Sequence, residues 1–247
     1  MAMMLVQIDE SPPSPDPLHD FWMFSPVHLA VVLIAAGLIA GLCSLGVRWR
    51  TTPKETALLQ VWGGVIVVSQ ATHMAWWCLP AQFKLSNSLP LQLCDLAGVV
   101  AAIAILTRAR WARTMIVFWG ILLSSWGFIT PVLRQGPAEP IFWMFWVNHL
   151  AIVGTAVYEI VAARYRPTKT DTLAAIGVSF GYVVAMVVLN TLEGETFNFG
   201  YVGAEGVDPI NLLGPYPWRL IPLSIGVAAL MWGFGVLLRQ FGPEHEE

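Results

Sequence analysis

A cysteine and a histidine lie in two separate apolar segments of the sequence, where they could act as a nucleophile and its base. Cys94 lies four residues after Pro90, and His149 lies in the apolar segment that begins at Pro140. A thiolate is a strong nucleophile, and an imidazole can take the proton of its thiol. The pair predicts attack of Cys94 on a carbonyl group. Two single residues form no motif, so a packing role for both stays open.

Other polar residues also lie in apolar segments, and each is a candidate for function because a polar group inside a membrane is costly. Asp95 is adjacent to Cys94, but neighbouring residues of a helix diverge by about 100°, so the two side chains cannot point at one atom. Asp95 could instead form a structural ion pair with Arg219. The polar residues at similar predicted depth are Gln70, His73, Gln92, Cys94, Asp95, Asn148, His149, Asn190 and Arg219.

Some further residues with reactive or ionisable side chains are interpreted as structural or peripheral. Cys43 and Cys78 lie in apolar surroundings and are expected only to pack. Glu159 is expected to extend from the end of its helix toward Arg164 or water. His28 lies one turn into the first apolar segment and is expected at the membrane interface.

Two functions of other classes fit the same residues. A zinc-dependent lipid hydrolase would use His73 and His149, with Asp95 or Cys94 as a third ligand. The sequence lacks the HxxxH and HExxH patterns, so we predict no metal and no cofactor. A non-catalytic receptor or carrier for a small or lipidic ligand would also use a polar pocket. A carrier fits less well, because no internal repeat is visible and a permeation path needs polar groups at both ends.

The composition decides what kind of chain must position these residues. Hydrophobic residues make up 56% of the 247 residues and charged residues 12%, about half the share of an ordinary soluble domain. So few charges cannot cover a surface that faces water, which predicts a polytopic membrane protein. The net charge of −3 and the absence of a basic cluster argue against nucleic acid as a partner.

Seven segments are apolar enough and long enough to cross a membrane, which predicts an all-α protein with seven transmembrane helices. Proline stands near the start of several of them, where its missing N–H costs little. The predicted segments are Ser25–Val47, Ala57–Leu79, Leu89–Leu106, Arg113–Leu133, Pro140–Ala163, Thr172–Leu192 and Pro217–Leu238.

The distribution of Lys and Arg predicts the orientation, because these residues are enriched in cytoplasmic loops. Ten of the thirteen follow the first, third, fifth and seventh segments. The N-terminus is therefore predicted outside and the C-terminus inside, with an outer tail (1–24), a transmembrane domain (25–240) and a cytoplasmic tail (241–247). Cys94 and Asp95 then lie about 8–9 Å, and His149 about 14 Å, below the outer ends of their helices. This depth predicts one polar pocket that opens outward, near the long loop Glu193–Tyr216.

The run Leu89-Pro90-Leu91-Gln92-Leu93-Cys94-Asp95-Leu96 resembles a block of the YwaF-type bacterial integral membrane proteins. The resemblance continues at Asn148-His149, at Asn198-Phe199-Gly200-Tyr201 and at Leu212-Leu213-Gly214-Pro215-Tyr216-Pro217-Trp218. That family is similar in turn to eukaryotic transmembrane acyltransferases, which move acyl chains between phospholipids without coenzyme A and through a cysteine.

The resemblance implies a multi-pass enzyme of the bacterial plasma (inner) membrane that acts on phospholipid and lysophospholipid. Cys94 would form a thioester with the acyl chain, and His149 would take and return the proton. Transfer to water in place of a lysolipid would make the protein a lipase. Side chains implied in substrate binding or in stabilising the oxyanion are Gln92, Asp95, Asn148, Arg219 and His73.

Overall fold

The computed structural model describes residues 16–192, 198–202 and 210–241. The predicted tails 1–24 and 241–247 and the loop Glu193–Tyr216 therefore lie partly outside the described residues. Within the described part, every regular element is a helix, and one isolated antiparallel bridge joins Asp20 to Gln135. The predicted all-α class is thus confirmed.

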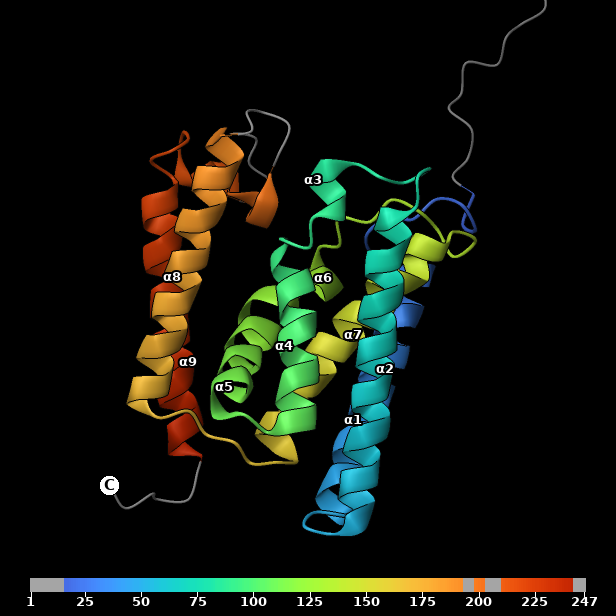
Figure 1. The fold of residues 1–247 in the computed structure, drawn as a ribbon, viewed down its shortest axis with the longest axis vertical. Helices are drawn as coiled ribbons and strands as arrows, with labels where there is room; N and C mark the ends of the chain where they lie inside the picture. Colours follow the sequence, from blue (N-terminus) through green and yellow to red (C-terminus); the bar gives the residue numbers. More distant parts are fainter. Residues whose placement is uncertain (1–15, 193–197, 203–209, 242–247) are drawn as a thin grey trace, which may run out of the picture.

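Long helices lie side by side and are joined by short connections (Figure 1). Each of the seven predicted segments coincides with one helix, except that the fourth corresponds to three consecutive helical pieces. The described elements are α1 (Pro26–Arg48), α2 (Pro53–Cys78), α3 (Leu85–Ser88), α4 (Leu93–Thr107), α5 (Arg110–Phe118), the π-helix η1 (Trp119–Ser124), α6 (Trp126–Ile129), α7 (Pro140–Val161), α8 (Lys169–Leu192), the 3₁₀-helices η3 (Phe199–Tyr201) and η4 (Ile210–Leu213), and α9 (Leu220–Gln240).

Five of these helical segments are long and apolar enough to cross a membrane, where the sequence predicted seven spans. They are α1, the run Arg110–Ile129, α7, α8 and α9. Helix α2 is long enough but less apolar, and α4 has only 15 residues. The predicted third segment began at Leu89, but Leu89 is extended with ψ of 122° because it precedes Pro90. Helix α4 therefore starts only at Leu93.

The ends of the helices follow local sequence signals. Pro26, Pro53 and Pro140 each stand at the first position of their helix. The Ser25 hydroxyl caps α1 by accepting the N–H of His28 at 3.1 Å. Pro217 was predicted to open the last helix, but it lies in the turn before α9.

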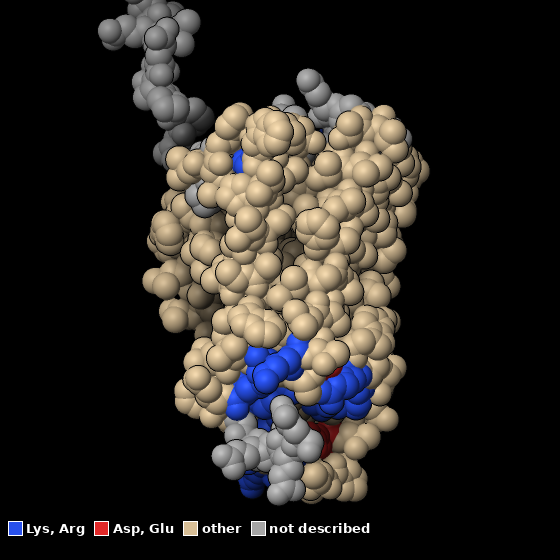
Figure 2. Space-filling view, turned by 90° about the vertical axis from the view of Figure 1, so that its left-hand side faces the viewer, with Lys and Arg blue, Asp and Glu red and all other residues tan. Residues whose placement is uncertain are grey.

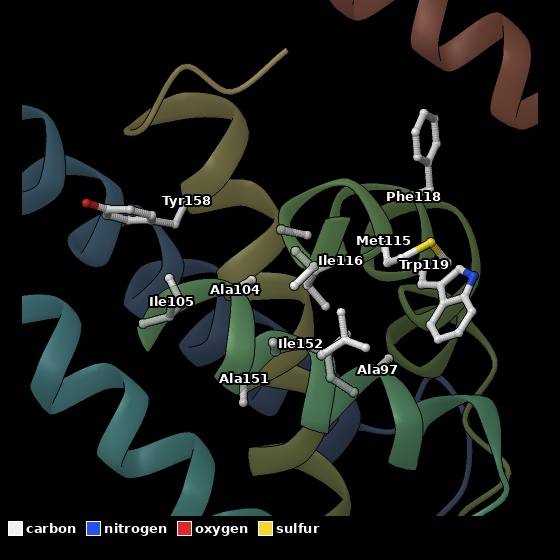
Figure 3. Packing of buried hydrophobic residues seen from close by; sticks show 14 of the residues in the cluster. Ala97, Ala104, Ile105, Met115, Ile116, Phe118, Trp119, Ala151, Ile152 and Tyr158 are labelled. Carbon is white, nitrogen blue, oxygen red and sulfur yellow. The ribbon is translucent and has the colours of Figure 1, made fainter. Parts of the chain in front are cut away.

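Helix α4 lies in the interior, between α2, α5 and α7, while α8 and α9 pair on one side (Figure 1). Ala97, Ala101 and Ala104 on α4 are completely buried. Because these side chains are small, the neighbouring helices can approach α4 closely. Figure 3 shows Ala97, Ala104 and Ile152 among the residues that meet between the helices. This packing fixes α4 relative to α7.

A buried charge cluster joins the far end of α4 to α5 and α7. The Glu159 side chain is 0% exposed and accepts from Arg108 Nη1 at 2.6 Å and from Arg113 Nε at 2.7 Å. We expected Glu159 to reach Arg164 or water, and this expectation was wrong. A carboxylate without such partners would be too costly to bury, so the two arginines hold it inside the bundle.

Lys and Arg gather at the end of the bundle where this cluster lies. Figure 2 shows them at the lower end of one face, with a long stretch of uncharged surface above. The connections at that end carry Arg48, Arg50, Arg108, Arg110, Arg164, Arg166 and Lys169.

The predicted orientation can be checked with reporter fusions in these connections. Fusions within 49–52, 108–109 and 164–168 should all report the cytoplasm, because each connection lies at the basic end. Fusions within 80–84 and 134–138 at the opposite end should report the outside and serve as controls. An outside signal from any basic connection would contradict the orientation.

The buried cluster should dominate the stability of this end. We expect Glu159→Gln to lower the free energy of unfolding by about 3–5 kcal/mol, because two arginines then lose their counter-charge. Arg110→Gln is the matched control, since Arg110 pairs with Asp171 but its side chain is 60% exposed. Its cost should stay below about 1 kcal/mol. Denaturant unfolding in detergent measures both, and equal losses would show that burial of the cluster is not the cause.

Candidate active site

Cys94 lies in the first turn of α4, because the helix begins at Leu93 and not at Leu89 as the sequence predicted. The chain before it is extended, with ψ of 145° at Gln92, and the helix begins at Leu93. The first N–H groups of a helix have no partner within it, and the positive end of the helix dipole lies there. The dipole of α4 therefore favours negative charge on the Cys94 sulfur.

His149 on α7 meets this thiol directly. Its Nε2 lies 3.4 Å from Cys94 Sγ, and its Nδ1 lies 2.8 Å from the carbonyl oxygen of Phe145. A carbonyl oxygen can only accept, so Nδ1 carries the hydrogen of the neutral ring. Nε2 then presents a lone pair to the thiol. The backbone of α7 thereby orients the His149 imidazole with the lone pair of Nε2 toward the thiol.

Ser124 is the other polar neighbour of the thiol. Cys94 Sγ lies 3.9 Å from Ser124 Oγ, and Ser124 is buried at the end of the π-helix η1. A π-helix shifts the register of the residues that follow it and often occurs at functional sites. Ser124 was not among the predicted site residues, because the π-turn has no recognisable sequence signal.

Asp95 and His73 form a second pair beside the first. His73 Nε2 on α2 lies 3.5 Å from Asp95 Oδ1, and Trp77 Nε1 donates to the same nitrogen at 3.2 Å. We expected an ion pair between Asp95 and Arg219, but the ion-pair contact of Asp95 among the described residues is with His73. Because adjacent residues diverge on a helix, Cys94 contacts α7 while Asp95 contacts α2.

A third pair completes a ring of polar contacts through α2, α4 and α7. Gln70, three residues before His73, donates from Nε2 to Asn148 Oδ1 at 2.6 Å, and Asn148 precedes His149. We call these six side chains the polar ring: Gln70, His73, Cys94, Asp95, Asn148 and His149.

Two glycines leave the space that the ring occupies, and sequence analysis missed both. A Cβ on Gly98 of α4 would overlap the amide of Gln70 and lie 3.0 Å from Asn148 Oδ1. A Cβ on Gly127 of α6 would overlap the imidazole of His149. Their role depends on the facing helix, so no pattern within their own segments indicates it.

Two of the predicted substrate-binding residues contact residues of the loop Glu193–Tyr216. Gln92 Oε1 accepts the N–H of Gly200 at 2.9 Å. Arg219 is buried, with its guanidinium 5.7 Å from the ring centre of Tyr216. Asn190 forms two hydrogen bonds with the backbone of Phe199, at 3.1 and 3.0 Å. The contacts of Gln92 and Asn190 attach 198–202 next to the segment that leads into Cys94.

The remaining histidine and cysteines of the helices lie apart from the ring. His28 was expected at the interface, but it is buried and its Nε2 lies 3.0 Å from the carbonyl oxygen of Phe128. Cys43 is buried and Cys78 is exposed. Among the described residues, no group of three or more His, Cys, Asp or Glu side chains has a geometry that could hold a metal ion.

The glycine at position 127 offers a test of the site geometry that leaves every reactive group in place. Gly127→Ala should displace the His149 ring and slow alkylation of Cys94 by about tenfold or more, because the thiol loses its base. Gly181→Ala is the matched control, since nothing lies within 4 Å of its Cβ. Mass spectrometry of the alkylated protein measures the rate. An unchanged rate in Gly127→Ala would mean that His149 does not depend on this contact.

Comparisons with known proteins place the chain in a family. The sequence model of the TMEM164 family matches residues 23–236, which include all seven helical segments apart from the last residues of α9. No curated protein and no solved structure matches the chain. Because the match covers most of the sequence, the chain belongs to the TMEM164 family of membrane proteins.

Proposed function

We propose that the protein is a membrane acyltransferase that moves an acyl chain from a phospholipid through a thioester on Cys94. The contact of 3.4 Å between Cys94 Sγ and His149 Nε2 carries this proposal. A half-buried thiol that faces the lone pair of a backbone-oriented imidazole has the arrangement of a nucleophile and its base. The resemblance at Leu89–Leu96 to YwaF-type proteins and to cysteine-dependent acyltransferases points to the same chemistry.

In the first half of the reaction, His149 Nε2 takes the thiol proton while Sγ attacks the ester carbonyl carbon. The tetrahedral intermediate collapses, the bond to the glycerol oxygen breaks, and His149 returns the proton to that oxygen. A lysophospholipid leaves, and the acyl chain stays on Cys94 as a thioester.

In the second half, the hydroxyl of another lysophospholipid attacks the thioester and gives its proton to His149. The new ester forms, and the bond between Sγ and the carbonyl carbon breaks. The proton then returns from His149 to the thiolate. Water in place of the lysophospholipid would give a free fatty acid, which is the hydrolase form of the same chemistry.

A lipid substrate fits the position of the site within apolar helices. The surfaces of α1, α8 and α9 expose many large apolar side chains, as expected for helices that contact acyl chains. With seven transmembrane helices and the N-terminus outside, the site lies in the outer half of the bacterial plasma membrane. A phospholipid of the outer leaflet would then reach Cys94 without crossing the bilayer.

The proposal is tested with purified protein, labelled phospholipid and lysophospholipid, and product analysis by mass spectrometry. Cys94→Ser should abolish transfer, because a hydroxyl is a far poorer nucleophile beside this base. His149→Gln should lower turnover by about 10²–10⁴-fold, because the amide cannot take a proton. Cys43→Ser is the matched control and should keep full activity.

Alkylation separates an enzyme from a receptor or carrier. In a Cys78→Ser background, which removes the exposed thiol, an alkylating probe should label Cys94 well before the buried Cys43. Retained lipid remodelling in Cys94→Ala, or equal labelling of Cys43 and Cys94, would rule out the nucleophile. A receptor or carrier would then be the better interpretation.

A further inference from the structure

His73 has the opposite hydrogen arrangement to His149. The indole nitrogen of Trp77 can only donate, and it donates to His73 Nε2 at 3.2 Å. Nε2 must therefore accept, and the hydrogen of the neutral ring lies on Nδ1. His149 thus presents the lone pair of Nε2 to the thiol, whereas His73 carries an N–H group at Nδ1.

The N–H group of His73 meets no acceptor in the part of the chain that the structure describes. Nδ1 is buried and has no hydrogen-bond partner among the described residues. A buried donor without an acceptor is costly, and such a group in a native fold calls for an explanation. An oxygen atom of the substrate would accept a hydrogen bond from this N–H group.

The position of His73 decides which substrate oxygen is concerned. Asp95 Oδ1 lies 3.5 Å from its Nε2, and Asp95 is adjacent to the nucleophile Cys94. Gln70, one turn earlier on α2, bonds to the residue that precedes His149. The imidazole of His73 therefore lies beside the residue adjacent to the nucleophile, and the atom that gains charge when the thiol attacks is the carbonyl oxygen of the acyl group.

We infer that His73 Nδ1–H donates a hydrogen bond to the oxyanion that forms when Cys94 attacks an acyl carbonyl. This inference rests on the proposed function. His73 keeps its proton throughout: the bond from Sγ to carbon forms, the carbonyl electron pair moves onto oxygen, and Nδ1–H stabilises that charge. The electron pair returns when the leaving oxygen departs with the proton from His149. Trp77 acts as a positioning residue, because its donation to Nε2 keeps the hydrogen of the His73 imidazole on Nδ1.

Two substitutions separate the roles of the two ring nitrogens. Nδ1 lies two bonds from Cβ, as does the amide nitrogen of asparagine, whereas Nε2 lies three bonds away, as does that of glutamine. His73→Asn can therefore replace the donor at Nδ1, and His73→Gln can replace only Nε2. His73→Phe replaces neither and keeps a ring of similar size.

Two reagents separate carbonyl addition from thiol reactivity. A p-nitrophenyl ester acylates Cys94 through an oxyanion, whereas iodoacetamide alkylates it by displacing iodide without one. Both are used on full-length protein in detergent, in a Cys78→Ser background, and labelling of Cys94 is followed by mass spectrometry. The alkylation rate also reports whether each variant keeps an intact thiol and base.

His73→Gln and His73→Phe should slow acylation by the ester about 10²–10³-fold, the usual loss for one oxyanion donor, and His73→Asn should recover most of the rate. Alkylation should change by less than about threefold in all three. Trp77→Phe should slow only the acylation, because the ring hydrogen is then free to move to Nε2.

Distinct results would overturn the inference. Normal acylation in all three His73 variants, or recovery by glutamine but not by asparagine, would show that Nδ1 is not the donor. Equal loss of alkylation and acylation would show that His73 only maintains the structure. If Cys94 of the unsubstituted protein reacts with both reagents no faster than Cys43, the proposed function fails, and the inference fails with it.

Discussion

Polar side chains buried between apolar helices must pair with one another, and this requirement determines how α2, α4 and α7 meet. The contacts between Cys94 and His149 and between Gln70 and Asn148 tie α7 to the other two helices. The contact between Asp95 and His73 ties α4 to α2. Without water, each broken contact leaves a group with nothing else to bond, so the pairs specify one arrangement of the three helices.

The same requirement operates at both ends of α4 and α7. Glu159 lies about 15 Å further along α7 than His149. Its partner Arg108 caps the C-terminal end of α4, whereas Cys94 lies in the first turn at the N-terminal end. Buried alanines fill the space between these two points. A helix pair fixed at both ends cannot slide or rotate freely, which keeps the thiol and the imidazole in register as a reaction would require.

The sequence predicted most of the helical segments and placed Cys94 and His149 in one half of the bundle, because both follow from properties of single segments. Apolar length and proline positions locate a helix, and depth along a helix follows from counting residues. Partners were harder to predict. Asp95 contacts His73, and Glu159 bonds to Arg108 and Arg113. These choices depend on the rotation of each helix about its axis, which residue counts do not give.

Features that depend on the facing helix had no signal at all. Nothing in its own segment distinguishes Gly127 from another glycine of a membrane helix. Only the structure shows that the His149 imidazole occupies the space where a Cβ at position 127 would lie. The π-turn of η1, which brings Ser124 to the thiol, adds one backbone residue to a turn without any change in composition. The sequence thus identifies the reactive groups by residue type, whereas the neighbours that orient these groups determine their reactivity. His149 accepts because a carbonyl of its own helix holds Nδ1–H, and His73 donates because Trp77 occupies Nε2.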